Sequence, residues 1–196
     1  MKKLLLIAAV AVFTLTGVNA QEETTTGSFV QGDLFVSGTA SYSSEKFMDN
    51  KAEVFAFVPK VGYFVADNIA VGLQLGYGFA KAESGSVDTG DVNAFRAGAF
   101  ARYYSKPASQ FSLFGELSFD YVTSEDKLAD YKENGFDVTI APGLSYFVSD
   151  RFALEATVGL LSYSSSKPDV DGAEATNSFS TGLDFSNINF GLVYKF

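Results

Sequence analysis

Hydrophobic residues recur at every second position in eight segments of this chain, which is the alternation expected of β-strands. On one face of each segment every position is apolar or glycine, and none carries a charge. The opposite face mixes acidic, basic and small residues. The pattern predicts an all-β chain of eight antiparallel strands. The segments cover residues 34–42, 55–65, 69–79, 95–103, 111–121, 136–148, 152–160 and 188–196.

Alternation alone fits both a soluble barrel with an apolar interior and a membrane barrel with an apolar exterior. The segments are about ten residues long, enough to cross a bilayer at a tilt near 45°. Aromatic residues also gather at both ends of the apolar face, as at the two interfaces of a bilayer. We therefore predict a closed up-and-down transmembrane β-barrel. The aromatic residues are Tyr63, Tyr103, Phe111, Tyr146, Phe152, Tyr194 and Phe196 at one end, and Tyr42, Phe55, Tyr77, Phe79, Phe95, Tyr121 and Phe136 at the other.

The connections between segments alternate in length. Short turns at 66–68, 105–110 and 149–151 alternate with long polar stretches at 44–52, 82–92, 123–135 and 164–183. Outer-membrane barrels have short periplasmic turns and long extracellular loops. The sequence thus predicts four acidic extracellular loops, with both termini in the periplasm.

An internal repeat relates two of the hairpins. Residues 59–71 and 142–154 share proline, Tyr-Phe-Val, aspartate and alanine at a constant offset of 83 residues. The repeat maps the second and third segments onto the sixth and seventh. Pro59 and Pro142 lack the N–H that a strand interior needs, so we expect a β-bulge at each.

The N-terminus has the features of a secretory signal. Lys2 and Lys3 precede an apolar run at 4–15, and small residues follow at 18–20. The run is too short to span a membrane. We predict a cleaved signal peptide over residues 1–20, with cleavage between Ala20 and Gln21, a periplasmic lead at 21–28, and the barrel at 29–196.

Composition removes several function classes. Lys2 and Lys3 are the only charged residues of the predicted signal, so the remainder holds 12 basic and 23 acidic residues. This balance disfavours nucleic-acid binding. The chain has no Cys and no His, so thiol chemistry and the commonest general base and metal ligand are missing. We expect no cofactor, no metal site and no enzyme activity.

Two acidic motifs resemble known kinds of site. Glu116 and Asp120 share a face of one strand about 13 Å apart, whereas paired glycosidase carboxylates lie about 6.5–9.5 Å apart at most. The run 169–172 is similar to the start of a calcium loop but lacks its closing glutamate. Both are interpreted as ordinary charged positions.

The charges of the polar face are expected to fill the lumen. An eight-stranded barrel is just wide enough inside for side chains, and five acidic and four basic residues point inward. A turn centred near residue 108 would place Arg96 opposite Asp120, and Arg102 diagonal to Glu116, so these two ion pairs are predicted. The full predicted network is Asp33, Lys60, Arg96, Arg102, Glu116, Asp120, Asp137, Glu155 and Lys195.

The C-terminal segment supports a family resemblance. Residues 189–196 alternate and end on phenylalanine, and the turns contain Tyr-Phe-Val-x-Asp. Over residues 29–196 the chain resembles the small outer-membrane β-barrel proteins related to OmpX and to the membrane domain of OmpA. The resemblance implies the outer membrane of a Gram-negative bacterium, contact with its lipid and lipopolysaccharide, and recognition by the barrel-assembly machinery. The assembly signal would be Phe190, Leu192, Tyr194 and Phe196.

Three functions are consistent with these features. The first is a structural or interaction protein, a monomeric barrel that displays acidic loops to a surface partner of unknown identity. The second is a small porin-like channel. The third is a barrel enzyme, which the absence of histidine disfavours, since enzymes of this fold use histidine.

Overall fold

The computed structural model describes residues 27–170, 172–183 and 188–196. The predicted signal peptide, its cleavage site and residues 21–26 of the lead lie outside these ranges. Within them, no helix has the length and apolar character needed to cross a membrane. The strands are β1 (Leu34–Phe47), β2 (Asn50–Ala66), β3 (Ile69–Ser84), β4 (Val87–Tyr104), β5 (Phe111–Asp126), β6 (Tyr131–Phe147), β7 (Phe152–Val158), β8 (Leu161–Pro168), β9 (Thr176–Thr181) and β10 (Ile188–Lys195).

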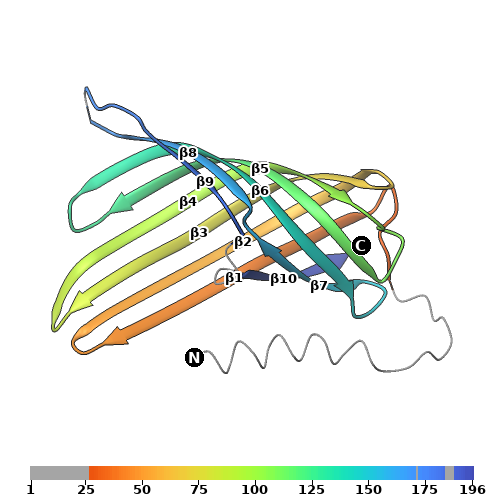
Figure 1. Ribbon diagram of the computed structural model, residues 1–196, viewed down its shortest axis with the longest axis horizontal. Coiled ribbons are helices and arrows are strands. Elements are labelled where there is room, and N and C mark those ends of the chain that lie inside the picture. The colour runs from red at the N-terminus through yellow and green to blue at the C-terminus, as the bar shows by residue number, and fades with distance from the viewer. Residues whose placement is uncertain (1–26, 171, 184–187) are drawn as a thin grey trace.

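These ten described strands form one closed antiparallel sheet (Figure 1). β7 and β8 both pair with β6, while β10 pairs with β7 and β9 pairs with β8. The seventh barrel strand is therefore β7 followed by β8, and the eighth is β9 followed by β10. β1 pairs with β10 and β5 with β6, which closes the ring. The predicted eight-stranded antiparallel barrel is confirmed.

The apolar face points outward. Leu73 is 64% exposed, and large apolar side chains are exposed on every barrel strand. From Ile69 to Phe79 along β3, residue steps of about 3.3 Å at a tilt near 40° rise about 25 Å, the height of the apolar band in outer-membrane barrels. The outer surface thus has the dimensions of a lipid-facing band.

A charge placed in this band is expected to destabilise the barrel. Leu73→Arg should lower the free energy of unfolding by about 2–4 kcal/mol, because the guanidinium would face the middle of the bilayer. The measurement is urea unfolding of the barrel refolded into lipid vesicles. Val87, equally exposed at 64% but on a hairpin beyond the band, is the matched control, and Val87→Arg should cost less than about 0.5 kcal/mol. Equal effects at the two positions would contradict the lipid-facing orientation.

The two ends of the barrel differ (Figure 1). At one end, here called the short-turn end, the connections are 67–68, 105–110 and 148–151, close to the predicted turns. At the other, the hairpin end, the strands extend far past the apolar band and turn at 48–49, 85–86 and 127–130. The polar stretches predicted as loops are therefore mostly strand. The last of them, 164–183, contains the end of β8 and all of β9.

The two prolines are accommodated differently. At Pro59 the prediction of a bulge is wrong: the β2–β3 ladder lapses over Val58 and Pro59 and resumes in the same register. At Pro142 the expected bulge is present. β6 pairs with β7 up to Gly143↔Thr157 and with β8 from Ile140↔Leu161. Between these two residue pairs, the partner strand has one residue more than β6. This bulge separates β7 from β8.

Candidate functional site

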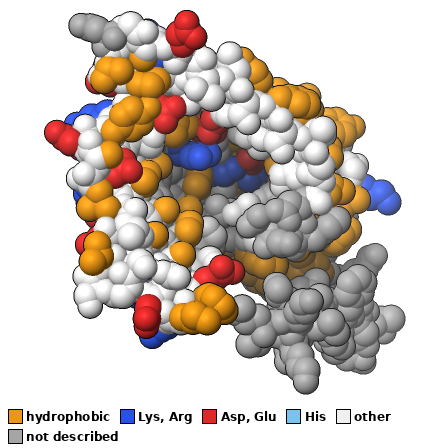
Figure 2. Space-filling model, turned by 60° about the vertical axis from the view of Figure 1, so that its left-hand side comes forward, with side chains coloured by type: hydrophobic (Ala, Val, Ile, Leu, Met, Phe, Trp, Pro, Cys, Tyr) orange, Lys and Arg blue, Asp and Glu red, His pale blue; other side chains and the backbone are white. Residues whose placement is uncertain are grey.

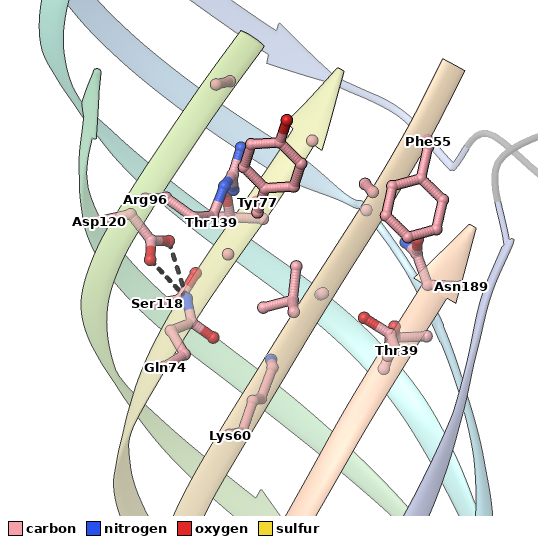
Figure 3. A pocket seen from close by; sticks show the side chains of 18 of the residues that line it. Thr39, Phe55, Lys60, Gln74, Tyr77, Arg96, Ser118, Asp120, Thr139 and Asn189 are labelled. Carbon is pink, nitrogen blue, oxygen red and sulfur yellow. Dashed lines mark hydrogen bonds between the residues drawn. The ribbon is translucent and has the colours of Figure 1, made fainter. Parts of the chain in front are cut away.

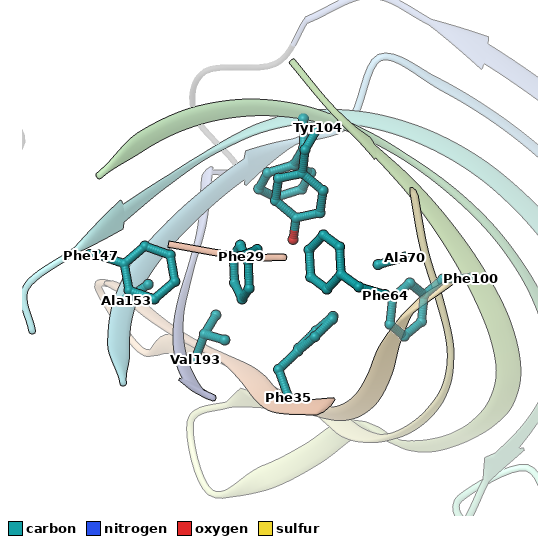
Figure 4. Packing of buried hydrophobic residues seen from close by; sticks show 10 residues of the cluster. Phe29, Phe35, Phe64, Ala70, Phe100, Tyr104, Phe147, Ala153 and Val193 are labelled. Carbon is teal, nitrogen blue, oxygen red and sulfur yellow. The ribbon is translucent and has the colours of Figure 1, made fainter. Parts of the chain in front are cut away.

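The lumen contains a layer of aromatic side chains at the short-turn end. Phe29 lies at its centre and is 1% exposed. Its ring centroid is 4.7 Å from that of Phe64 and 4.8 Å from that of Phe147. Figure 4 shows these rings converging across the barrel opening. The aromatic layer consists of Phe29, Phe35, Phe64, Phe100, Tyr104, Phe114 and Phe147.

The central ring comes from the chain before β1. The Phe29 N–H donates a hydrogen bond to the carbonyl of Pro107 at 2.8 Å, and the Gly32 N–H donates to the carbonyl of Phe64 at 2.9 Å. Lys195 Nζ donates to the carbonyl of Ser28 at 2.5 Å. These bonds tie residues 28–32 across the mouth of the barrel, so the segment closes the short-turn end.

Glycines make room for the inward rings. Phe35, Phe100 and Phe114 each lie directly opposite a glycine on the neighbouring strand. A Cβ atom at any of these glycines would overlap the facing ring. These inward phenylalanines are not among the predicted lumen residues, because the glycines that make room for them lie on neighbouring strands. The pairs are Phe35↔Gly62, Phe100↔Gly72 and Phe114↔Gly143.

A buried ion cluster lies above the aromatic layer, on the side of the hairpin end. Arg102 Nε is 2.7 Å from Glu116 Oε2, and Arg102 Nη1 is 3.0 Å from Glu155 Oε1. Arg102 Nη1 also donates to the Tyr104 hydroxyl at 3.0 Å. Lys60 Nζ lies 2.5 Å from Glu116 Oε1. Two cations and two carboxylates therefore form one neutral group, hereafter the Arg102 cluster.

The Arg102 guanidinium also packs on the aromatic layer. Its Cζ atom lies 4.6 Å from the centroid of Phe114 and 5.2 Å from that of Phe100. A cation over an aromatic face is attracted by the ring quadrupole, more strongly away from water. Arg102 is 2% exposed. The aromatic layer and the Arg102 cluster therefore form one continuous packed plug.

The predicted ion pairs had mixed outcomes. Arg102 and Glu116 do pair, but directly opposite each other rather than diagonally. The prediction of an Arg96–Asp120 pair is wrong. β4 and β5 are offset by two residues from the predicted register, so Gly98 lies opposite Asp120. Arg96 Nη2 instead lies 3.8 Å from Asp137 Oδ2.

The other predicted lumen charges lie at two levels. Asp33 and Lys195 are at the short-turn end, where Lys195 Nζ is 3.4 Å from Asp33 Oδ2. Asp120 lies deep in the lumen and accepts hydrogen bonds of 2.7 and 2.8 Å from Gln74 Nε2. Gln74 is not part of the predicted network. An uncharged polar residue on the inward face of β3 was the available signal.

Above the plug, the lumen is hollow. A cavity of about 430 Å³ occupies the part toward the hairpin end, and Figure 2 shows charged side chains at the base of the hollow. Its floor includes Lys60, Gln74, Glu116 and Asp120. Its walls include small and apolar inward residues of β2, β3 and β4, namely Val54, Ala56, Val58, Ala80, Val92 and Ala94.

No cluster of three or more Asp and Glu residues that could hold a metal occurs in the described ranges. The acidic run 169–172 is only partly described, since residue 171 lies outside those ranges. The C-terminal residues of the predicted assembly signal lie on β10 or directly after it. Phe190, Leu192 and Phe196 are exposed on the outside, and the Tyr194 ring contacts Phe196 at 5.0 Å between centroids.

A closed antiparallel barrel with an apolar exterior band, and with a lumen plugged at one end by buried aromatic and charged side chains, has the features of an integral membrane β-barrel. The chain belongs to the family described as outer membrane protein beta-barrel domain, which matches residues 6–196. Membership of this family is consistent with a location in the bacterial outer membrane.

Solved structures agree on the fold. Neisserial surface protein A (NspA) is 16% identical, with 83% of this chain and 97% of NspA covered and a TM-score of 0.54. The outer membrane protein OprG from Pseudomonas aeruginosa is also 16% identical, with 88% of this chain and 98% of OprG covered and a TM-score of 0.52. No curated protein sequence matches the chain.

Proposed function

We propose that this protein is a closed outer-membrane barrel that anchors four β-hairpins at the cell surface and neither conducts solutes nor catalyses a reaction. The observation that carries the proposal is the plug. The aromatic layer and the Arg102 cluster occupy the lumen at the short-turn end, and their side chains are almost fully buried. Eight-stranded barrels have interiors just wide enough for side chains.

The orientation follows from the asymmetry of the ends. The short-turn end would face the periplasm and the hairpins the exterior, as in other barrels of this type. Beyond the girdle at the hairpin end, outward positions carry both lysines and carboxylates, and Lys51 and Lys132 pair with Glu53 and Glu125. The lysines are Lys46, Lys51, Lys81 and Lys132. These cations would lie level with the phosphates of lipopolysaccharide, which supports its assignment as a partner.

The hairpins also present acidic groups. Glu53 accepts a hydrogen bond of 2.9 Å from the Tyr42 hydroxyl and lies 3.1 Å from Lys51 Nζ. The hydrogen bonds from Lys51 and Tyr42 hold the pKa of Glu53 below its usual value. This carboxylate would stay ionised in mildly acidic surroundings. A charged, rigidly paired hairpin is a suitable surface for a protein or glycan partner.

Planar-bilayer conductance tests the closed barrel. Purified full-length barrel should give no reproducible open state under conditions in which a general porin inserted in the same bilayer gives regular steps. A reproducible open state of the unmodified protein would favour a small channel, the second candidate, which the cavity at the hairpin end supports.

The C-terminus is proposed to direct assembly. Deleting Phe196 should reduce the amount of barrel inserted in the outer membrane of cells, because the terminal aromatic is part of the segment that the assembly machinery would recognise. Refolding into detergent in vitro should remain intact, since Phe196 is 62% exposed on the outside. Heat-modifiable mobility on gels measures both. Equal insertion of the truncated and full-length proteins would contradict the proposal.

A further inference from the structure

Next to the floor of the cavity, the described residues include one carboxylate more than the nearby cations balance. The Arg102 cluster is neutral in itself. Beyond it, Asp120 and Asp137 lie directly opposite each other on β5 and β6, with Cβ atoms expected about 4.5–5.5 Å apart. Arg96 is the nearby cation, and it pairs with Asp137. Among the described residues no ion pair to Asp120 occurs.

Asp120 is nevertheless deeply buried. The residue is 1% exposed, and its carboxylate accepts hydrogen bonds from the side-chain amide of Gln74. An ionised group removed from water normally requires a charge partner as well as hydrogen bonds. The charge of Asp120 therefore has no partner of opposite sign among the described residues.

A second, uncharged acceptor lies at the same place. Gln74 is 5% exposed, and its Oε1 atom is buried without a hydrogen-bond partner in the described part of the chain. Figure 3 shows this oxygen turned away from the Asp120 carboxylate, in the wall of the cavity that Gln74 lines. Buried polar atoms in native proteins almost always have a partner. An acceptor without a donor, beside a carboxylate that is hydrogen-bonded but has no ion-pair partner in the described part of the chain, points to a cationic donor.

The cavity above these two groups determines the size and character of that donor. Its volume is about 430 Å³, and its walls combine aliphatic side chains of β2, β3 and β4 with hydroxyl and amide groups and with Arg96, whose charge is paired with Asp137. A primary ammonium group offers three N–H donors and one positive charge. It would satisfy Gln74 Oε1 and the Asp120 carboxylate together, while a small apolar body would pack against Val54, Val58 and Val92.

We propose that this cavity, the lumen pocket, binds a small primary amine in its ammonium form, with the nitrogen at Asp120 and Gln74 Oε1. The pocket is blind, because the Arg102 cluster lies beneath it. Binding there requires no passage through the barrel, so this assignment goes beyond the closed-barrel function and is tested separately from conductance.

The test is a fluorine NMR titration of 4-fluorobenzylammonium against the full barrel in lipid nanodiscs. 4-Fluorobenzyl alcohol, with the same shape and no charge, is the matched ligand, and empty nanodiscs measure partition into lipid. We expect a saturable change in the fluorine chemical shift of the ammonium compound. The alcohol should bind at least about tenfold more weakly, because the charge-assisted hydrogen bonds are lost.

Variants locate the site. Asp120→Asn keeps the shape and removes the charge, and it should weaken binding of the ammonium at least about tenfold. Asp33→Asn removes a carboxylate at the short-turn end and should leave binding unchanged. If Asp120→Asn does not fold, Ala56→Leu, which fills the pocket from the β2 wall, should abolish binding with both carboxylates retained. Equal titration of ammonium and alcohol, or unchanged binding in Asp120→Asn or in Ala56→Leu, would overturn the assignment.

Discussion

Replacing Arg102 with alanine is expected to lower the free energy of unfolding of the barrel by about 3–5 kcal/mol. The substitution removes the ion-pair partner of Glu155, which is 4% exposed, and one of the two partners of Glu116. A buried carboxylate left without a cation retains its desolvation cost. The loss should therefore exceed that of an ordinary ion pair.

The measurement is urea unfolding in lipid vesicles, with Arg96→Ala as the matched control. Arg96 lies on the same strand and the same face as Arg102, but its side chain is 38% exposed and 3.8 Å from its partner. Its loss should cost less than about 1 kcal/mol. Equal losses for the two arginines would show that the Arg102 cluster contributes no more than an exposed pair.

A double variant separates pairing from packing. Arg102→Met with Glu155→Gln removes one charge of each sign and leaves the Lys60–Glu116 pair intact. Residues of one ion network couple by about 0.5–3 kcal/mol, so the double variant should lose less than the sum of the two single variants by that amount. Strict additivity would contradict the pairing.

The membrane-spanning part of the barrel was predictable because lipid makes one face of every strand uniformly apolar. The eight predicted segments all fall on barrel strands, and Leu73, Leu117 and Phe190 point outward as predicted. The seventh barrel strand is the informative exception. Alternation over 152–160 hides the bulge after Val158, beyond which the outward positions become odd-numbered, as at Tyr163.

The hairpins were not predictable from periodicity. Beyond the aromatic girdle both faces of a strand lie in water, so Lys81 and Glu83 follow Phe79 at outward positions. The hydrogen-bonded ladder continues there, between Glu83 and Asp88 for example, without any hydrophobic pattern. Polar, charged stretches of this kind look like loops in sequence.

For the lumen charges, the sequence predicts correctly which face of each strand carries them, but not which residues pair with each other. A register error of two residues leaves every side chain on its own face, so Arg96, Arg102 and Asp120 were correctly placed inside. The same error assigned Arg96 the wrong partner, because the conformation of the 105–110 turn determines the register. The inward phenylalanines were missed because their space is provided by glycines on neighbouring strands, which a single strand does not reveal.

Replacing Phe29 with alanine is expected to cost about 3–5 kcal/mol of the free energy of unfolding, the range for removal of a buried phenylalanine. The ring is 1% exposed and contacts four others, those of Phe35, Phe64, Tyr104 and Phe147. Those rings belong to β1, β2, β4 and β6, so they cannot all move inward to fill the void without distorting the sheet. A cavity in a closed barrel should therefore persist.

The control for Phe29→Ala is Phe47→Ala, in which a ring that is 70% exposed at a hairpin tip is lost. It should change the unfolding free energy by less than about 0.5 kcal/mol. The comparison is specific to the plug, because residues 27–33 precede β1 and Phe29 contributes no sheet hydrogen bonds between barrel strands. If both variants unfolded at the same urea concentration, the segment before β1 would not stabilise the short-turn end, and the closed lumen would depend on the Arg102 cluster alone.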